Sequence, residues 1–383
     1  MDLKSEWTAR SPASIRMPCP ERRHRITRDF RSFALSILLC LIPEVTFAEA
    51  GPDLATSATR GQMAGLSGSE RLRMFVWGKW LETDQAPRNV IEAMRGALTR
   101  NGYYHDGPVP RIVWTDLYAT PLLGYETNVN GGVAQDSFTT GGFIFDVDPA
   151  YRAVSGVVVG LDGSAETRIA WRNGHTINAA VEGSAGWAPE NGIDFSRGSV
   201  QLCSRNNLTR WVFLDGCILH AASNRVLSSS TIDQTSVTLS TLFQTAAAYH
   251  EVSGEVAETQ TNDYDQKTAT LALNTVWNQA VTGLAVTFGE LVAGQTVLDR
   301  RIGFDLRWQA GRHPVGFGLW HSTSRGGTFL GIDQIDNAAG VSVSWQTRPG
   351  TTIKAGYTRT LSTAAFYNDD SVFLRVQFDG FGL

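Results

Sequence analysis

Apolar and polar residues alternate strictly along several stretches near the end of the chain. Between residues 301 and 309, four large apolar residues are separated by charged, polar or glycine residues. The four are Ile302, Phe304, Leu306 and Trp308. The same period of two recurs in 315–319, 341–345 and 372–378. A period of two places all the apolar side chains on one face of a β-strand, so these stretches predict amphipathic strands.

Strand-like runs of this kind fill the chain from residue 111 onward. The sixteen runs are 111–127, 141–147, 151–161, 165–172, 175–186, 196–205, 208–220, 234–244, 246–257, 267–278, 281–290, 299–309, 313–323, 339–347, 351–361 and 370–379. Most have roughly the 9–11 residues that a tilted barrel strand needs. The runs therefore predict an all-β protein, and sixteen strands become fourteen if two of the weaker early runs do not span.

The connections between the runs alternate in length. Short ones include Asn173-Gly174 and Asn206-Asn207, and long ones include 128–140 and 324–338. Only Gly163-Ser164 breaks the alternation. Antiparallel transmembrane β-barrels have short periplasmic turns and longer external loops, whereas a soluble sandwich has no such requirement. The pattern predicts an outer-membrane barrel over residues 111–383.

The alternation also predicts which side chains face the barrel lumen. An Arg or Lys that faces lipid at the membrane midplane costs about 2–4 kcal/mol, so charges should share the inward parity. Twelve polar residues have that parity and are candidates for contact with a transported solute. They are Arg168, Arg172, Glu182, Glu251, Glu255, Asn274, Arg301, Asp305, Arg307, Lys354, Arg375 and Gln377.

The start of the chain has the features of a signal peptide. Five arginines between Arg22 and Arg31 precede the apolar run 33–42, and Ala48-Glu49-Ala50 forms a small-residue cleavage site. The apolar run is about half the length of a transmembrane helix, so residues 1–50 predict an exported protein.

Residues 51–110 predict a linker followed by a periplasmic helical hairpin. In that hairpin Ser69 caps a helix over 70–82, and Pro87 begins another that ends near Arg100. The hairpin either packs against or partly plugs the barrel, or contacts a partner.

Charge and composition exclude several classes of function. Residues 1–50 hold eight of the 33 Lys and Arg residues and six of the 37 Asp and Glu residues, which leaves 25 against 31. A mildly acidic remainder of this kind does not indicate binding to nucleic acid. No residue spacing indicates a metal site or a cofactor, and the glycine pairs lack the context of a nucleotide-binding loop.

Two cysteines, Cys203 and Cys217, remain after residue 50. If Asn206-Asn207 forms a tight hairpin turn, the two cysteines lie too far apart along their strands for a disulfide. If 204–216 is instead a loop, the bond forms readily and is expected in an oxidising compartment. The two interpretations exclude each other, and the second is slightly favoured.

His321 and Ser322 are the one pair that suggests catalysis, because barrel acyl hydrolases use a His–Ser pair. The spacing does not match the H-x-S-N signature of the barrel deacylases, so no enzymatic activity is expected.

The stretch from Pro121 to Gly132, PLLGYETNVNGG, resembles the G-Y-x-x-N-x-N segment that opens the barrel of surface lipoprotein assembly modifier proteins. In those proteins a periplasmic tetratricopeptide-repeat domain precedes an outer-membrane barrel, and they help to deliver lipoproteins to the cell surface. This chain has one helical pair in place of the repeats. More broadly, the layout resembles Gram-negative outer-membrane barrels, although the chain ends in Gly-Phe-Gly-Leu instead of an aromatic residue.

The combined prediction is an outer-membrane barrel in contact with outer-membrane lipid, with a porin-like lumen for small solutes or ions. The alternative is a barrel that assists translocation or surface display of a protein or lipoprotein, with the helical hairpin as the partner contact.

Overall fold

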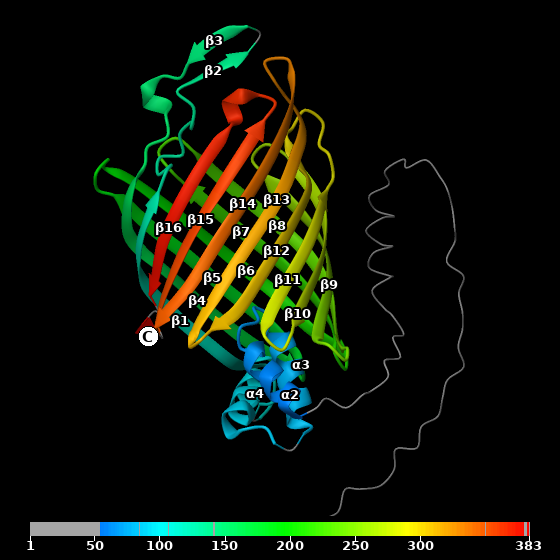
Figure 1. The fold of residues 1–383 in the computed structure, drawn as a ribbon. Coiled ribbons are helices and arrows are strands. Elements are labelled where there is room, and N and C mark those ends of the chain that lie inside the picture. Colours follow the sequence, from blue (N-terminus) through cyan, green and yellow to red (C-terminus); the bar gives the residue numbers. More distant parts are fainter. Residues whose placement is uncertain are drawn as a thin grey trace, which may run out of the picture.

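The computed structural model describes residues 54–83, 85–105, 107–140, 142–348, 350–378 and 381–382. The predicted signal peptide, residues 1–50, lies outside this part of the chain. Three helices come first, and strands follow (Figure 1). The helices are α2 (Leu54–Ala64), α3 (Glu70–Leu81) and α4 (Arg88–Arg100).

Fourteen antiparallel strands form one closed barrel. Each strand pairs with its neighbours in chain order, and β16 pairs with β1 to close the sheet. The two-residue strand β17 (Phe381–Gly382) adds to β1. The barrel strands are β1 (Arg111–Glu126), β4 (Gly156–Arg172), β5 (His175–Ala188), β6 (Ile193–Thr209), β7 (Val212–Asn224), β8 (Ser229–Gln244), β9 (Tyr249–Thr261), β10 (Asp265–Val276), β11 (Ala280–Gly289), β12 (Val297–Ala310), β13 (His313–Phe329), β14 (Ile332–Arg348), β15 (Thr351–Ser362) and β16 (Asp369–Phe378).

The all-β barrel is confirmed with the smaller of the two expected strand counts. Sixteen is wrong for two reasons. Run 141–147 belongs to a small hairpin outside the barrel, and runs 151–161 and 165–172 belong to the single strand β4. Gly163-Ser164 is not a turn, since Gly163 pairs with Ala119 on one side and Gly183 on the other. The one break in the long–short alternation therefore disappears.

Several turns lie elsewhere than expected. The β6–β7 turn is at Arg210-Trp211, not at Asn206-Asn207, which continue β6. Segment 324–338 is not a loop, because β13 and β14 extend through it to a turn at Leu330-Gly331. The Asn173-Gly174 turn is as expected, and Gly174 has a φ of 71°, which glycine adopts without strain.

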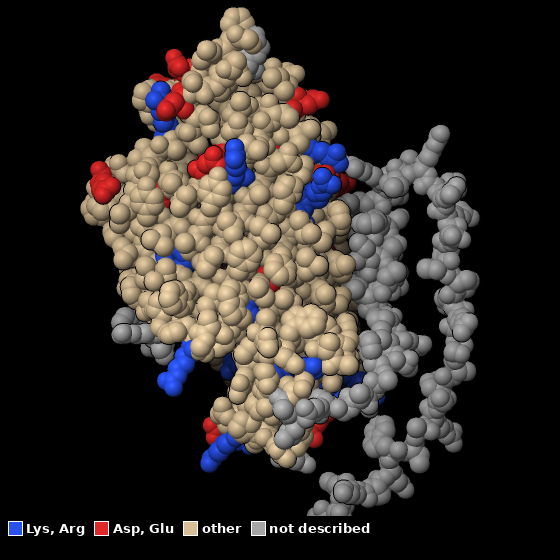
Figure 2. Space-filling view, viewed as in Figure 1, with Lys and Arg blue, Asp and Glu red and all other residues tan. Residues whose placement is uncertain are grey.

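Apolar side chains cover the outer face of the barrel wall. On the consecutive strands β11 to β14, Leu284, Ile302, Leu319 and Val343 are each about half exposed at 42%, 48%, 50% and 47%. In Figure 2, Lys, Arg, Asp and Glu gather near the two ends of the barrel, and most of the wall between them lacks these residues. An apolar band between two polar rims is the outer surface expected for a transmembrane barrel.

The three helices form one unit at the end of the barrel that carries the short turns (Figure 1). Ser69 caps α3 as expected, since its hydroxyl accepts a hydrogen bond from the Leu72 amide at 3.1 Å. Helix α2 lies within the stretch that was expected to be a linker, so the unit is larger than a hairpin. Among the described residues, no helix has the length and apolar character needed to cross a membrane.

The connection between β1 and β4 is the longest loop of the described chain. It contains the hairpin β2 (Ser137–Thr140) and β3 (Phe143–Asp146), which projects from the end of the barrel opposite the helices (Figure 1). The hairpin is tied back to the barrel by Phe138, whose ring lies 5.1 Å from that of Phe366 and 6.1 Å from that of Phe329. Residues 127–155 are called the long loop below.

Candidate functional site

The candidate site is the interior of the barrel. A closed barrel pairs the backbone of each strand with two neighbours, so it can cross a bilayer without leaving sheet edges in lipid. Barrels of this design lie in bacterial outer membranes, with short turns on the periplasmic side. The helix end of this barrel is therefore the periplasmic end, and the end with the long loop is external.

Eleven of the twelve candidate residues face the interior. Some line a chamber beside the helices, others line two chambers nearer the external end, and Arg301 stacks on the ring of Trp320 at 4.6 Å. The eleven are Arg168, Glu182, Glu251, Glu255, Asn274, Arg301, Asp305, Arg307, Lys354, Arg375 and Gln377. Arg172 is exposed at the periplasmic end of β4, beyond the register shift that follows Ala170.

Charged residues that the sequence analysis did not single out complete the interior. Arg205 and Asp215 were missed although both lie within predicted strand runs and have the inward parity. Arg71 was missed because charges on a helix are usually solvated. Glu126 and Arg225 were missed because they lie at strand ends, where alternation stops.

Two buried ion-pair groups hold the helices in the periplasmic mouth. Arg71 at the start of α3 donates to both carboxylate oxygens of Asp215 on β7, at 2.7 and 2.8 Å. Glu70 accepts from Arg168 on β4 at 2.6 Å and from Arg100 on α4 at 2.8 Å. Strands β4 and β7 therefore both form ion pairs with the first turn of α3. We refer to residues 54–103 as the helical plug.

An apolar seat supports these ion pairs. Phe75 of α3 packs edge-on against Trp211 and Tyr249, with ring centroids 5.0 and 5.8 Å apart. The seat continues over inward-facing residues of β8, β10 and β11, namely Leu242, Val276 and Val281. Helix α2 is fixed by Arg60, which donates to Asn278 at 2.6 Å and to the carbonyl of Ala246 at 2.9 Å. The plug thus contacts the barrel from β4 round to β11, and Arg307 adds β12.

Above the plug lies a chamber of about 720 Å³, here called the inner chamber. Its floor is the turn from Ser67 to Ser69 together with the first turn of α3, and its wall is formed by strands β1, β4 and β6–β12. Its lining is mainly polar and charged. Glu251 on β9 lines the chamber together with Ser69, the cap of α3.

The contacts of Glu70 set its protonation. Burial alone would raise its pKa, but the hydrogen bonds and charges of Arg168 and Arg100 outweigh burial and lower the pKa from 4.5 to about 2. A plug that leaves the mouth returns Glu70 to water and to its ordinary pKa. The ionised carboxylate therefore stabilises the seated plug above pH 4.5, and this contribution is lost as the pH falls from about 4.5 to about 2.

We expect acid to release the plug. The difference between the two pKa values corresponds to on the order of 3 kcal/mol of seating free energy. Ion conductance across planar bilayers should increase stepwise as the pH is lowered from 5 to 2.5. In Glu70→Gln the conductance should already be raised at pH 7, and the acid step should be missing. An acid step of the same size in Glu70→Gln would show that another group is responsible.

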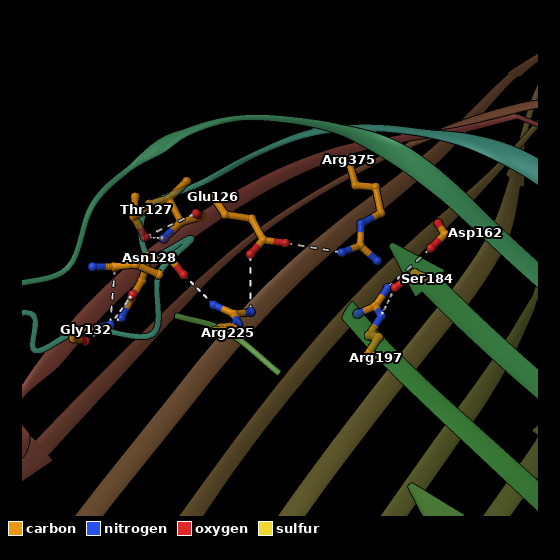
Figure 3. A network of polar contacts seen from close by, with 11 residues as sticks. Glu126, Thr127, Asn128, Gly132, Asp162, Ser184, Arg197, Arg225 and Arg375 are labelled. Atoms are coloured by element: carbon orange, nitrogen blue, oxygen red, sulfur yellow. Dashed lines mark hydrogen bonds and ion pairs between the residues drawn. The ribbon is translucent and has the colours of Figure 1, made fainter. Parts of the chain in front are cut away.

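At the external end, the long loop folds inward and is held by a second polar network (Figure 3). Glu126, the last residue of β1, lies 3.4 Å from Arg375 of β16 and 3.4 Å from Arg225 in the β7–β8 turn. Arg225 also donates to the carbonyl of Asn128. The network joins three segments across the external mouth. Beside it, Arg197 of β6 donates to Ser184 at 2.7 Å and lies 3.8 Å from Asp162.

The two asparagines of the N-x-N motif shape this loop. The Asn128 side chain donates to the Gly132 carbonyl at 2.8 Å and accepts from its amide at 3.0 Å. Asn130 donates to the Arg152 carbonyl at 2.7 Å and accepts from the amide of Val154 at 2.9 Å. Between them, the fully buried Val129 packs inside the barrel mouth. The motif on which the resemblance to lipoprotein assembly modifiers was based thus has a structural role in folding the loop.

Glu126→Gln should loosen the long loop. The change removes the charge that pairs with both Arg225 and Arg375, which we expect to cost about 1–2 kcal/mol. Amide hydrogen exchange of residues 127–133 should become roughly tenfold faster. Arg359→Gln is the control, because it breaks only the exposed Arg359–Asp370 pair at the outer surface. Equal exchange rates in wild type and Glu126→Gln would show that the network does not hold the loop.

Cys203 and Cys217 form a disulfide, and they also lie on paired strands of one hairpin. The two interpretations exclude each other only for a turn at Asn206-Asn207, which the structure does not have. With the turn at Arg210-Trp211, the cysteines are directly opposite each other, and their Cα atoms are 4.1 Å apart.

His321 and Ser322 lie on opposite faces of β13. His321 shares the outward parity of Leu319, and Ser322 shares the inward parity of Trp320. The two side chains therefore point to opposite sides of the barrel wall.

No protein-family model matches the chain, and no curated protein matches it. Among solved structures, Pseudomonas aeruginosa OccK9 (OpdG) is similar with a TM-score of 0.40 and 8% identity, over 70% of this chain and 98% of that chain. Pseudomonas putida OprB at high pH has a TM-score of 0.41 and 8% identity, over 70% of this chain and 94% of that chain. Acinetobacter baumannii OccAB3 has a TM-score of 0.40 and 7% identity, over 70% of this chain and 99% of that chain.

Proposed function

We propose that this protein is an outer-membrane conduit for small solutes or ions, with its periplasmic mouth occupied by the helical plug. One observation carries the proposal: inside a closed barrel with an apolar outer face, charged side chains line open chambers. Besides the inner chamber, two more lie toward the external end, with volumes of about 460 and 420 Å³. Charged side chains that line a water-filled lumen select the ions or solutes that pass through it, and a barrel that only anchors a protein has no need of them.

The size of the chambers favours small solutes. Volumes of a few hundred Å³ accommodate molecules the size of a sugar or a dipeptide and exclude folded proteins. Arg375 and Gln377 line both outer chambers, so the two outer chambers are adjacent. We expect passage through the whole barrel to require movement of the plug, because Ser67, Gly68 and Ser69 form the floor of the inner chamber.

Swelling of proteoliposomes tests the conduit. Liposomes that contain the purified protein are diluted into isotonic solutions of neutral sugars of increasing size, and the rate of swelling is followed by light scattering. The conduit predicts a rate that rises when the plug is released and falls steeply as the sugar becomes larger. Swelling no faster than in protein-free liposomes, with the plug both seated and released, would contradict it.

A second candidate is assistance in the delivery of a protein or lipoprotein to the cell surface, which the resemblance to surface lipoprotein assembly modifiers implies. The observation in its favour is that the plug protrudes from the periplasmic mouth, where Ile91 of α4 is 46% exposed (Figure 1). This role predicts fewer protease-accessible lipoproteins on cells whose protein lacks residues 69–102. The conduit alone predicts an unchanged number.

A further inference from the structure

Two cations lie side by side in the smaller of the two outer chambers. Lys354 of β15 and Arg375 of β16 are register partners, and both line the chamber of about 420 Å³. Register partners on antiparallel strands have Cα atoms about 4.5–5.5 Å apart, and their side chains share one face of the sheet. Like charges in this arrangement destabilise a sheet, and an anion bound between them removes the repulsion. We call this chamber the loop chamber, because Thr127 and Asn128 of the long loop form part of its wall.

The barrel wall around these two cations offers them a single carboxylate. Their own register row continues with Ser344 on β14 and Gly124 on β1. The next inward row toward the periplasm is uncharged on the same four strands. The next inward row toward the outside adds Glu126, which lies 3.4 Å from Arg225 and 3.4 Å from Arg375 (Figure 3). Three cations therefore surround one carboxylate, which leaves two positive charges uncompensated.

The other carboxylate that lines the loop chamber is too distant to compensate them. Asp369 begins β16 at the external end, six residues from Arg375, which corresponds to about 20 Å along the strand. Within the described part of the chain, Lys354 makes no hydrogen bond or ion pair, and its ammonium nitrogen lies 6.0 Å from the ring centroid of Phe373. The ammonium group of Lys354 is therefore available to a solute.

A neutral donor completes the set. Gln377 lies two residues beyond Arg375 on the same face of β16, and it also lines the loop chamber. Two residues of a strand span about 7 Å, so the side-chain ends of Lys354, Arg375 and Gln377 can all reach one small group placed between them. Arginine offers a planar fork of N–H donors and lysine a compact positive charge, and both bind phosphate groups. The amide of Gln377 adds a further N–H donor.

We propose that the loop chamber binds small phosphorylated solutes, with the phosphate group at Lys354, Arg375 and Gln377. This rests on the proposed function and names a class of solute that the conduit takes. A phosphate monoester carries a charge of about −1.5 to −2 at pH 7, which matches the two uncompensated positive charges. A single carboxylate leaves one of them unmatched. The volume of about 420 Å³ accommodates a molecule the size of a hexose phosphate.

Calorimetric titration of the whole detergent-solubilised protein tests the site without requiring transport or any variant. At about pH 7.5 the probes are four sugars of similar size: glucose 6-phosphate as dianion, glucuronate as monoanion, glucose as neutral analogue and glucosamine as cation. We expect glucose 6-phosphate to bind about tenfold more tightly than glucuronate, and glucose and glucosamine to bind more weakly than both. Binding of glucuronate or glucose as tight as that of glucose 6-phosphate would overturn the inference, because charge would then not select the solute.

Lys354 is the residue to change, since no ion pair within the described part of the chain depends on it. Lys354→Gln should weaken binding of glucose 6-phosphate about tenfold. Lys354→Glu places a carboxylate opposite Arg375 and should weaken it about a hundredfold. Lys354→Arg keeps the charge and should retain the affinity within about threefold.

The matched control removes a cation from the outer face of the same strand. Arg359→Gln breaks only the exposed pair with Asp370 and should leave the affinity for glucose 6-phosphate within about twofold of wild type. Unchanged affinity in both Lys354→Gln and Lys354→Glu would overturn the inference. Swelling with neutral sugars reports on the conduit independently. Sugar flux without preferential binding of glucose 6-phosphate therefore rejects the site alone, and binding without flux rejects the conduit alone.

Discussion

Asp215→Asn should raise the open probability of the barrel strongly. The substitution leaves Arg71 without its charged partner at a position where both side chains are largely buried, at 13% and 17% exposure. Removing one member of a buried ion pair costs about 3–5 kcal/mol, and the partial exposure here reduces this to about 2 kcal/mol. At about 1.4 kcal/mol per tenfold change, the ratio of released to seated plug should rise roughly 30-fold. Single-channel recording measures this ratio as the open probability.

The matched control is Arg88→Gln on the same helical plug. Arg88 pairs with Glu92 at 3.1 Å, but the two side chains are 90% and 67% exposed, and such surface pairs contribute little. Its open probability should equal that of the wild type. An Asp215→Asn protein with the same open probability as Arg88→Gln would show that the Arg71–Asp215 pair does not hold the plug.

Ile302→Arg should strongly destabilise the barrel in lipid, and Gly303→Arg should not. Ile302 lies near the middle of β12 on the outer face and is 48% exposed. An arginine that faces lipid near the midplane costs about 2–4 kcal/mol. Gly303 is the next residue and has the inward parity, and a Cβ atom there meets nothing within 4 Å. Its arginine side chain enters the lumen and should change the stability by less than about 1 kcal/mol.

Reversible unfolding by guanidinium in lipid vesicles measures both free energies. Because the two positions are adjacent, they share strand, depth and chain context, and the introduced arginine lies on the outer face in one variant and on the inner face in the other. Equal losses for the two variants, or a larger loss for Gly303→Arg, would mean that the apolar face of β12 does not meet hydrocarbon.

The alternation of residues was sufficient to predict the barrel and the orientation of most interior side chains. Period two is a local property, so Ile302 and Asp305 could be assigned to opposite faces without knowledge of their neighbours. The strand count was harder, because a glycine-serine pair within a strand resembles a turn. Gly163-Ser164 was read as a connection, although both residues are paired on both sides in β4.

The plug and the long loop could not be predicted to the same extent. Their positions depend on contacts between distant residues, such as Arg71 with Asp215, and no local pattern encodes these. Helix α2 has few large apolar residues, so its composition resembles a linker, and its place is fixed by Arg60 and by packing against α3. The disulfide was obscured in the same way, since a shift of the turn from residues 206–207 to 210–211 changes which residues are opposite each other.

The most direct test compares planar-bilayer conductance of the whole protein with that of a variant that lacks residues 54–103. The deletion removes the helical plug and leaves every strand from β1 onward intact. A membrane barrel with a plugged lumen predicts low or intermittent current for the whole protein and a steady, severalfold larger current for the variant. No current from either protein, despite correct insertion into the bilayer, would contradict an open lumen above the plug.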